Sequence, residues 1–324
     1  MFNSLKLHSF NATTVFNSLK LPSFNPTAGQ WPAGSRPVLS CCLALSLLLA
    51  SACSKDADSG PTPVSKVILR QNAIGFYQAL YSTSQAPADA YAAAAYTEHQ
   101  LGTGFSLAGL KAYAAARRAK VGTTLAPRIL RTLVQGNLVG LHIEEPVTAD
   151  SSVARMTMLR FDDQGKITDH WEAAQGQPRR RANPNTMFDG AAVNYLSNSG
   201  VVGRDQLIKA DLQAFNNYDT LVVRQSRART YVQHNPLAHD GASGLIQLLM
   251  YLKGTGAVTV MTGYQRLAEG DFVMTLNNTQ TTPAVPGFTN LIGFDLSRLD
   301  EAGKNNEHWD VLQELNGADK SKVF

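Results

Sequence analysis

The sequence predicts an α+β protein with two tandem domains, each built of three N-terminal helices packed on a curved antiparallel sheet of about four strands. One observation is a pattern of eleven residues that occurs twice, at Gly165–Gln175 and at Gly303–Gln313. Both copies have Gly-Lys, two residues, an acid, His-Trp, an acid, two apolar residues and Gln. The other is that helical periodicity precedes strand-like runs in both halves, as in α+β folds. A repeat this long indicates two copies of one domain.

A second pair of matching segments supports the duplication. Tyr96-Thr97-Glu98-His99 corresponds to Tyr231-Val232-Gln233-His234. Each copy therefore runs from a Tyr-x-x-His to an acid-His-Trp-acid farther along the chain. We expect the first domain at 66–178, a linker at 179–194, the second domain at 195–315 and a tail at 316–324.

The first domain begins with helical patterns and ends with strand patterns. Val67, Ile74, Tyr77 and Tyr81 lie on one face of a helix. Pro87 suits the first turn of a second helix, which continues through an Ala-rich stretch. Short apolar runs separated by Gly, Asn and Asp follow Pro127 and are typical of antiparallel strands. We expect helices at 66–83, 88–96 and 107–119, and strands at Arg128–Gln135, Leu138–Glu144, Val153–Phe161 and Lys166–Ala174.

The second domain repeats this order. Ile208, Leu212 and Phe215 share one face of its first helix. Two further helices and a group of strands come after it. We expect these helices at Leu221–Arg229 and Gly244–Leu252, and strands at Val258–Arg266, Phe272–Asn278, Phe288–Arg298 and Asn305–Leu315.

Residues 1–53 have the features of a signal region. Arg36 precedes the apolar run Val38–Ala50, which is short for a membrane span and suits a signal-peptide core. The run leads to Leu-Ala-Ser-Ala-Cys53, which resembles a bacterial lipobox with Cys53 as the lipidated residue. Signal cleavage nearby and an uncleaved anchor are the alternatives. A small duplication farther upstream, Phe2–Leu7 and Phe16–Leu21, would be explained by a start codon assigned too early.

The lipobox predicts a lipoprotein of the bacterial cell envelope. Ser54 rather than Asp follows the cysteine, which resembles the pattern for sorting to the outer membrane, with the protein facing the periplasm. The polar residues 54–65 would form a flexible tether. Cys41 and Cys42 precede the cleavage point, so the mature chain would have no internal disulfide.

Charge argues against nucleic acid as a partner. The chain has 29 Lys and Arg and 25 Asp and Glu, and a formal net charge of +4. Lys6, Lys20 and Arg36 lie before Cys53, and no acid does. The remaining chain is nearly neutral and offers no electrostatic basis for binding nucleic acid.

The last strand of each domain carries the candidate chemistry. Side chains alternate along a strand, so His308 and Asp310 share one face and Trp309 lies on the other. His170 and Glu172 repeat this arrangement. A histidine and a carboxylate facing a pocket suit general acid–base catalysis. The alternatives are ligand contact without chemistry and a structural strand end, in which Trp packs the core and His bonds a helix cap.

The chain resembles the SnoaL-like polyketide cyclase family of the NTF2-like superfamily. The second copy carries the resemblance in Tyr231, His234-Asn235-Pro236 and Asp240-Gly241, and in its Gly-Lys-x-x-Glu-His-Trp-Asp-x-x-Gln. The resemblance implies a cystatin-type cone whose curved sheet and helices enclose an apolar pocket. Such domains pair through their sheets, so it also implies an internal pseudo-dimer or a homodimer. The first copy departs from the pattern with Gln100 and Leu101.

The resemblance further implies the roles of the site residues. Asp310 would be the base, and His234 and His308 would polarise the substrate carbonyl. The first copy would use Glu172, His99 and His170. The residues expected to contact a small apolar carbonyl ligand are Tyr231, Trp309, Asn235, Tyr96, Trp171 and His142.

The sequence gives no convincing metal or cofactor site. The seven histidines are scattered, and His234, His239 and Asp240 form a loop cluster rather than a spaced ligand set. No dinucleotide, Walker or nucleophile-elbow motif occurs. Three functions stay open: a cofactor-free lyase or isomerase, a lipid-anchored protein that binds a small apolar molecule, and a structural envelope protein. We expect the second copy to hold the functional pocket, because Pro236 stiffens its loop and Glu172 is longer than Asp310.

Overall fold

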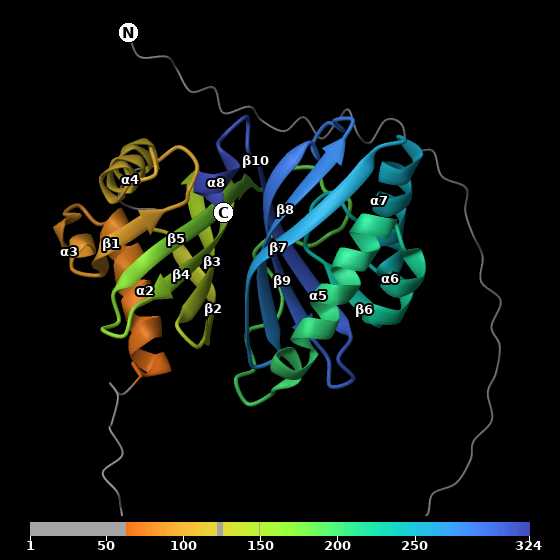
Figure 1. The fold of residues 1–324 in the computed structure, drawn as a ribbon, viewed down its shortest axis with the longest axis horizontal. Helices are drawn as coiled ribbons and strands as arrows, with labels where there is room; N and C mark the ends of the chain where they lie inside the picture. Colours follow the sequence, from red (N-terminus) through yellow and green to blue (C-terminus); the bar gives the residue numbers. More distant parts are fainter. Residues whose placement is uncertain (1–62, 122–125, 149) are drawn as a thin grey trace, which may run out of the picture. The chain divides into compact units, whose positions relative to one another are not determined.

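The computed structural model describes residues 63–121, 126–148 and 150–324 (Figure 1). Helices and strands alternate in two halves that begin with helices and end with strands. The first half contains α2 (Lys66–Tyr81), α3 (Ala86–Asp89), β1 (Ala92–Glu98), α4 (Leu107–Val121), β2 (Arg128–Gln135), β3 (Leu138–Thr148), β4 (Ser151–Phe161) and β5 (Ile167–Gly176). The second half contains α5 (Ser199–Asn217), α6 (Thr220–Ser226), β6 (Arg227–Gln233), α7 (Ala242–Gly254), β7 (Val258–Glu269), β8 (Phe272–Thr282), β9 (Asn290–Leu299) and β10 (Asn305–Glu314), followed by α8 (Lys320–Val323).

Each half of the described chain contains one five-stranded sheet. The strand orders are β1-β5-β4-β3-β2 and β6-β10-β9-β8-β7, which are the same order in the two halves. β1 pairs parallel with β5, and β6 pairs parallel with β10. The other neighbours are antiparallel, so both sheets are mixed rather than purely antiparallel.

The fifth strand of each sheet corrects the sequence prediction of about four strands. The Ala-rich stretch predicted as the helix 88–96 contains only the short α3, and its second part is β1. The predicted helix Leu221–Arg229 likewise ends with α6 at Ser226, and β6 follows it directly. Pairing with β5 and β10 explains the difference, because tertiary contacts routinely override the helix propensity of single residues.

The helices of each half pack against that half's own sheet. α2 begins after Ser65, whose hydroxyl accepts a hydrogen bond from the amide of Ile68. It then buries Phe76 and Leu80 against the apolar strand residues of the first half, such as Leu141. In the second half α5 lies across β7, with α6 and α7 beside it (Figure 1). The predicted α+β architecture is therefore present in both halves.

One apolar core joins the two sheets. It contains Trp171 and Met156 from the first sheet and Trp309 and Phe294 from the second, all at most 2% exposed. Gly140 allows a close approach, because a Cβ atom there would lie 2.6 Å from Sδ of Met274 on β8. The two sheets therefore share a core that includes the tryptophans that follow the candidate histidines.

Two glutamines form reciprocal hydrogen bonds between the halves. The amide of Leu312 donates to Oε1 of Gln175 at 2.8 Å, and the amide of Ala174 donates to Oε1 of Gln313 at 2.9 Å. These four residues occupy matching positions of the eleven-residue repeat. A contact in which each partner uses the same groups is the mark of a two-fold interface.

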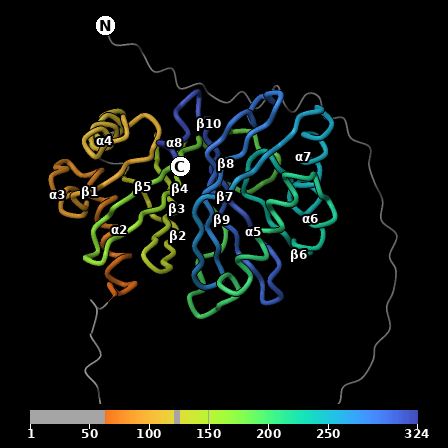
Figure 2. Tube along the Cα trace, viewed as in Figure 1, coloured from red at the N-terminus to blue at the C-terminus, as the bar shows by residue number. Residues whose placement is uncertain are grey.

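The segment that follows each sheet contacts the other half of the chain. After β5 the chain reaches the second half, where Nδ1 of His234 donates to the carbonyl oxygen of Thr186 at 2.7 Å. After β10 it returns to the first half, where Nδ1 of His99 donates to the carbonyl oxygen of Lys322 at 2.7 Å. The C-terminus accordingly lies beside the first sheet (Figure 2).

The N-terminal predictions fall on residues that the structure does not describe. The signal region, Cys53 and residues 54–62 of the tether all lie outside the described part of the chain. Among the described helices, none is long and apolar enough to cross a membrane.

Candidate functional site

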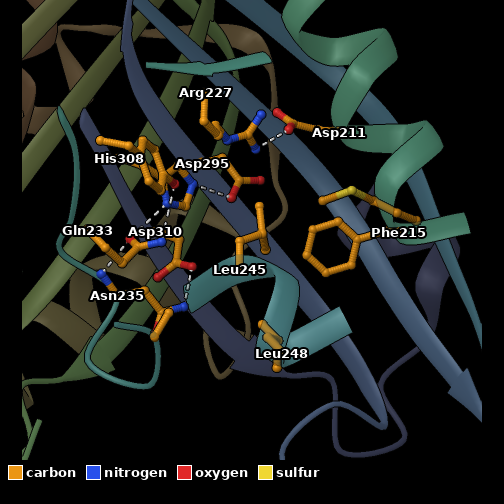
Figure 3. A pocket seen from close by; sticks show the side chains of 13 residues that line it. Asp211, Phe215, Arg227, Gln233, Asn235, Leu245, Leu248, Asp295, His308 and Asp310 are labelled. Carbon is orange, nitrogen blue, oxygen red and sulfur yellow. Dashed lines mark hydrogen bonds and ion pairs between the residues drawn. The ribbon is translucent and has the colours of Figure 1, made fainter. Parts of the chain in front are cut away.

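A pocket lies in the second half, between α5, α7 and the strands β6, β7, β9 and β10 (Figure 3). It encloses about 430 Å³ free of atoms, including solvent at its mouth. Polar side chains from the sheet line one side and apolar side chains, mostly from the helices, line the other. The lining residues are Asp211, Phe215, Arg227, Tyr231, Gln233, Asn235, Ala238, Leu245, Leu248, Met261, Asp295, His308 and Asp310.

Asp310 presents one free carboxylate oxygen. Its Oδ2 accepts a hydrogen bond of 2.5 Å from Nδ2 of Asn235, whereas Oδ1 has no hydrogen-bond partner among the described residues. The residue is only 6% exposed. Burial raises the pKa of Asp310 to about 6, although the nearby His308 acts in the opposite direction. The carboxylate is thus held in place by one oxygen, and the other is buried without a partner.

His308 is hydrogen-bonded at both ring nitrogens. Nδ1 lies 3.0 Å from Oε1 of Gln233, and Nε2 lies 3.0 Å from Oδ1 of Asp295. Gln233 Oε1 is fixed as an acceptor, because it also accepts from the backbone amide of Asn235. Two acceptors favour an imidazolium with both nitrogens protonated. Burial alone would lower the pKa of His308, but the hydrogen bond to Asp295 and its charge raise it.

Tyr231 adds a neutral hydroxyl to the polar side. Its ring is 2% exposed, and its hydroxyl accepts a hydrogen bond of 3.3 Å from Nε2 of Gln233. Burial raises the pKa of Tyr231, so the phenol keeps its proton and remains a donor. Arg227 lies beside it and forms an ion pair with Asp211.

His234, predicted as a polarising residue, does not line the pocket. Its ring stacks on Trp309 with 4.5 Å between the ring centroids, and Nε2 lies 3.0 Å from Oε1 of Glu307. Glu307 and Trp309 alternate with His308 along β10 and therefore lie on the face toward the other sheet. His234 and Trp309 are part of the packing between the halves and do not line the pocket with Asp310.

The first half buries its corresponding histidine and carboxylate. Glu172 accepts a hydrogen bond of 2.5 Å from Nη1 of Arg155, and both side chains are at most 3% exposed. Nε of Arg155 also bonds Glu145. In the sheet registers Arg155 faces Ala174, and the matching pair in the second half is Gly293 and Leu312. A buried arginine thus stands where the second half has a glycine.

The other predicted residues of the first half also have structural contacts. Nδ1 of His170 contacts the Glu98 carboxylate at 2.9 Å, and the hydroxyl of Tyr96 donates to the same carboxylate at 2.6 Å. His99 stacks on Trp171 with a centroid distance of 4.7 Å. The structure therefore keeps these residues together but places them in closed packing.

His142 lies on β3 and faces the second half. Its Nδ1 accepts a hydrogen bond of 3.0 Å from Nη1 of Arg131, and its ring meets Trp309 edge-on. It is fully buried. His142, predicted as a ligand contact, therefore lies between the sheets.

Four polar residues of the pocket were not predicted as site residues: Asp211, Arg227, Gln233 and Asp295. Asp295 is the cross-strand partner of Asp310, and only the pairing of β9 with β10 brings the two together. Gln233 lies in the recognised Tyr-x-x-His segment, one residue before His234. Alternation from Tyr231 along a strand would have placed Gln233 on the pocket face, but no strand was predicted over this segment.

Comparisons with solved structures find proteins of SnoaL-like and NTF2-like type. A SnoaL-like family protein from Agrobacterium tumefaciens, described as a candidate isomerase, is 17% identical with a TM-score of 0.28, covering 35% of this chain and 98% of that one. A candidate polyketide cyclase from Bacillus cereus is 13% identical with a TM-score of 0.31, covering 42% and 87%. An LEH-like epoxide hydrolase from M. tuberculosis is 17% identical with a TM-score of 0.30, covering 35% and 84%.

These similarities do not by themselves assign a family or a reaction to this chain. No protein-family profile and no curated protein matches the sequence. Any function therefore has to be argued from the pocket itself.

Proposed function

We propose that the chain is a lyase or isomerase that removes a proton next to a carbonyl group in the pocket of the second half. The observation that carries this proposal is the buried oxygen Oδ1 of Asp310, which has no partner among the described residues. A carboxylate whose pKa is raised to about 6 is charged at neutral pH and is a stronger base than an exposed aspartate. Asn235 holds its other oxygen and so fixes its direction.

The reaction would begin with proton transfer from carbon to Oδ1 of Asp310. The electron pair of the broken C–H bond moves toward the substrate carbonyl, which becomes an enolate. His308 supplies positive charge beside this oxygen, and the Tyr231 hydroxyl supplies a hydrogen-bond donor. Return of the proton from Asp310 to another carbon gives an isomerase. Attack of the enolate on a second carbonyl carbon gives an aldol-type cyclisation, in which the new alkoxide takes the proton back from Asp310.

We propose that the two halves are copies of one SnoaL-like domain paired through their sheets, and that only the second keeps an open site. The shared strand order and the reciprocal bonds of Gln175 and Gln313 support the pairing. Arg155 forms ion pairs with Glu145 and Glu172, so the carboxylate that corresponds to Asp310 is already paired in the first half. This supports an open site in the second half alone. The first half then serves as the partner that positions β10.

A second candidate is a binding protein for a small apolar ligand. Phe215, Leu245 and Leu248 form an apolar side of the pocket, opposite Asp310. Such a wall would hold a hydrocarbon portion of a ligand whether or not a reaction follows. A screen of β-keto esters and cyclic ketones separates the two candidates.

The screen would measure deuterium uptake at the α-carbon by nuclear magnetic resonance, and binding by calorimetry, with the full chain. Uptake above the buffer rate supports the enzyme. Tight binding with no uptake favours the binding protein, and absence of both contradicts each candidate for these compounds. The matched control for Asp310→Asn is Glu172→Gln, which also replaces a carboxylate by an amide but does so in the first half.

We also propose that the protein is held in the bacterial envelope by a lipid on Cys53, facing the periplasm. The lipobox-like sequence before Cys53 supports this. The polar residues after it would keep the folded part away from the membrane.

A further inference from the structure

Three side chains of the pocket converge in a way that the acid–base role does not require. Asp295, His308 and Asp310 each offer one ligand-type atom, and these atoms lie within 4.8 Å of one another. The group combines one imidazole with two carboxylates from the neighbouring strands β9 and β10 (Figure 3). It is distinct from the exposed loop cluster of His239 and Asp240.

Each of the three is held from outside by a side-chain amide. Gln233 bonds Nδ1 of His308, Asn235 bonds Oδ2 of Asp310, and Asn277 bonds Oδ2 of Asp295. The three amides do not use Nε2 of His308 or Oδ1 of either aspartate. Outer hydrogen bonds of this kind orient the ligands of protein metal sites.

The unpaired oxygen of Asp310 is an independent sign of a ligand. Nε2 of His308 and Oδ1 of Asp295 satisfy one another at 3.0 Å. Oδ1 of Asp310 has no such partner among the described residues, although the side chain lines the pocket and is more than nine-tenths buried. A buried carboxylate oxygen without a partner is costly, and a cation would satisfy it.

We propose that Asp295, His308 and Asp310 form a binding site for a divalent transition-metal ion such as Zn²⁺. Mixed imidazole and carboxylate ligands suit Zn²⁺, whose bonds to such atoms are about 2.0–2.2 Å long. Nε2 of His308 and Oδ1 of Asp295, now 3.0 Å apart, would have to separate slightly to hold an ion at such bond lengths. Mg²⁺ is disfavoured, because it prefers oxygen ligands and keeps its waters.

Binding replaces the proton between His308 and Asp295 and releases it to solvent. Three protein ligands leave a coordination position toward the pocket, as in catalytic zinc sites. The ion would take the same Asp310 oxygen that serves as the base. The inference therefore goes beyond the proposed reaction, and an ion in this place is expected to suppress it.

The first half supplies an internal comparison. Thr157 faces Glu172 across β4 and β5, at the position where Asp295 faces Asp310. Glu172 is bound by Arg155, so this half has neither the second aspartate nor the free oxygen. We expect one ion for each chain rather than two.

The test is calorimetric titration of the full chain with ZnCl₂ after treatment with a chelator, and with MgCl₂ for comparison. We expect one Zn²⁺ for each chain and no comparable Mg²⁺ binding. Asp310→Asn and Asp295→Asn keep the side-chain shape and should weaken Zn²⁺ by more than the roughly 10–100-fold that losing an outer partner costs. His239→Ala removes an exposed histidine and should leave the affinity unchanged. Visible absorption of bound Co²⁺ gives a second readout, independent of any reaction.

Three results would overturn the proposal. One is the absence of Zn²⁺ binding by protein whose circular dichroism shows it to be folded. Another is binding that Asp310→Asn and Asp295→Asn leave intact but His239→Ala removes. The third is deuterium uptake that rises on adding Zn²⁺, because it would exclude competition for Asp310. Loss of Zn²⁺ binding alone leaves the acid–base reaction testable by its own exchange assay.

Discussion

Replacing Glu172 by Gln should destabilise the protein without removing its chemistry. Glu172 and Arg155 form a buried ion pair at 2.5 Å, with side chains 3% and 1% exposed. Removing one partner of such a pair costs about 3–5 kcal/mol, because the other charge stays buried. Arg155 keeps Glu145, so we expect the lower end, about 3 kcal/mol. At about 2–4 °C for each kcal/mol, the melting temperature should fall by roughly 6–12 °C.

The assay is thermal unfolding followed by circular dichroism, together with deuterium exchange measured at 25 °C on the folded protein. Asp310→Asn is the matched variant in the second half. Asp310 has no ion pair within the described residues, so the melting temperature of the Asp310→Asn variant should differ little from that of the wild type. If Glu172→Gln keeps its melting temperature but loses the reaction, the assignment of Glu172 to structure is wrong.

Three further predictions concern pairing, pH and the lipid anchor. Gln175→Ala and Gln313→Ala each leave a strand amide without its partner, and each should lower the free energy of unfolding by about 1 kcal/mol in denaturant titration. The exposed Gln206→Ala is the control. No loss of stability in either variant would contradict the sheet pairing. Burial, with Arg131 and His234 nearby, lowers the pKa of His142 in the folded state. The unfolded chain therefore takes up a proton below about pH 6.5 that the folded chain does not. The free energy of unfolding should decrease by up to about 1.4 kcal/mol for each unit by which the pH is lowered. His142→Gln should reduce this fall between pH 7 and pH 5, and an unchanged slope would refute it. Cys53→Ala should move the protein from the membrane to the soluble fraction, whereas unchanged fractionation would reject the lipobox.

The sequence was sufficient for the faces of the last strands and for the other elements in their order, but not for β1 and β6. The eleven-residue repeat and strand alternation placed His308 with Asp310 and set Trp309 apart from them, and β10 has this arrangement. Repeats and a period of two are local properties, so one chain is enough to read them. Arg128–Gln135 was even predicted with its observed bounds.

The sequence was insufficient where a residue's role depends on a distant strand. The Ala-rich stretch before Glu98 has high helix propensity, and only pairing with β5 makes it a strand. The family resemblance placed His234 with Asp310, but the residue follows β6 and stacks on Trp309. Asp295 is separated from Asp310 by a turn, so no short motif joins them.

The most direct test of the proposed function compares deuterium exchange at the α-carbon of a responsive ketone in the wild-type chain and in Asp310→Asn. General base catalysis contributes roughly 10²–10⁴-fold, so the enzyme-dependent rate should fall by about that factor while the fold is retained. Exchange that survives in Asp310→Asn within about twofold would show that Asp310 is not the base and would contradict the proposed chemistry.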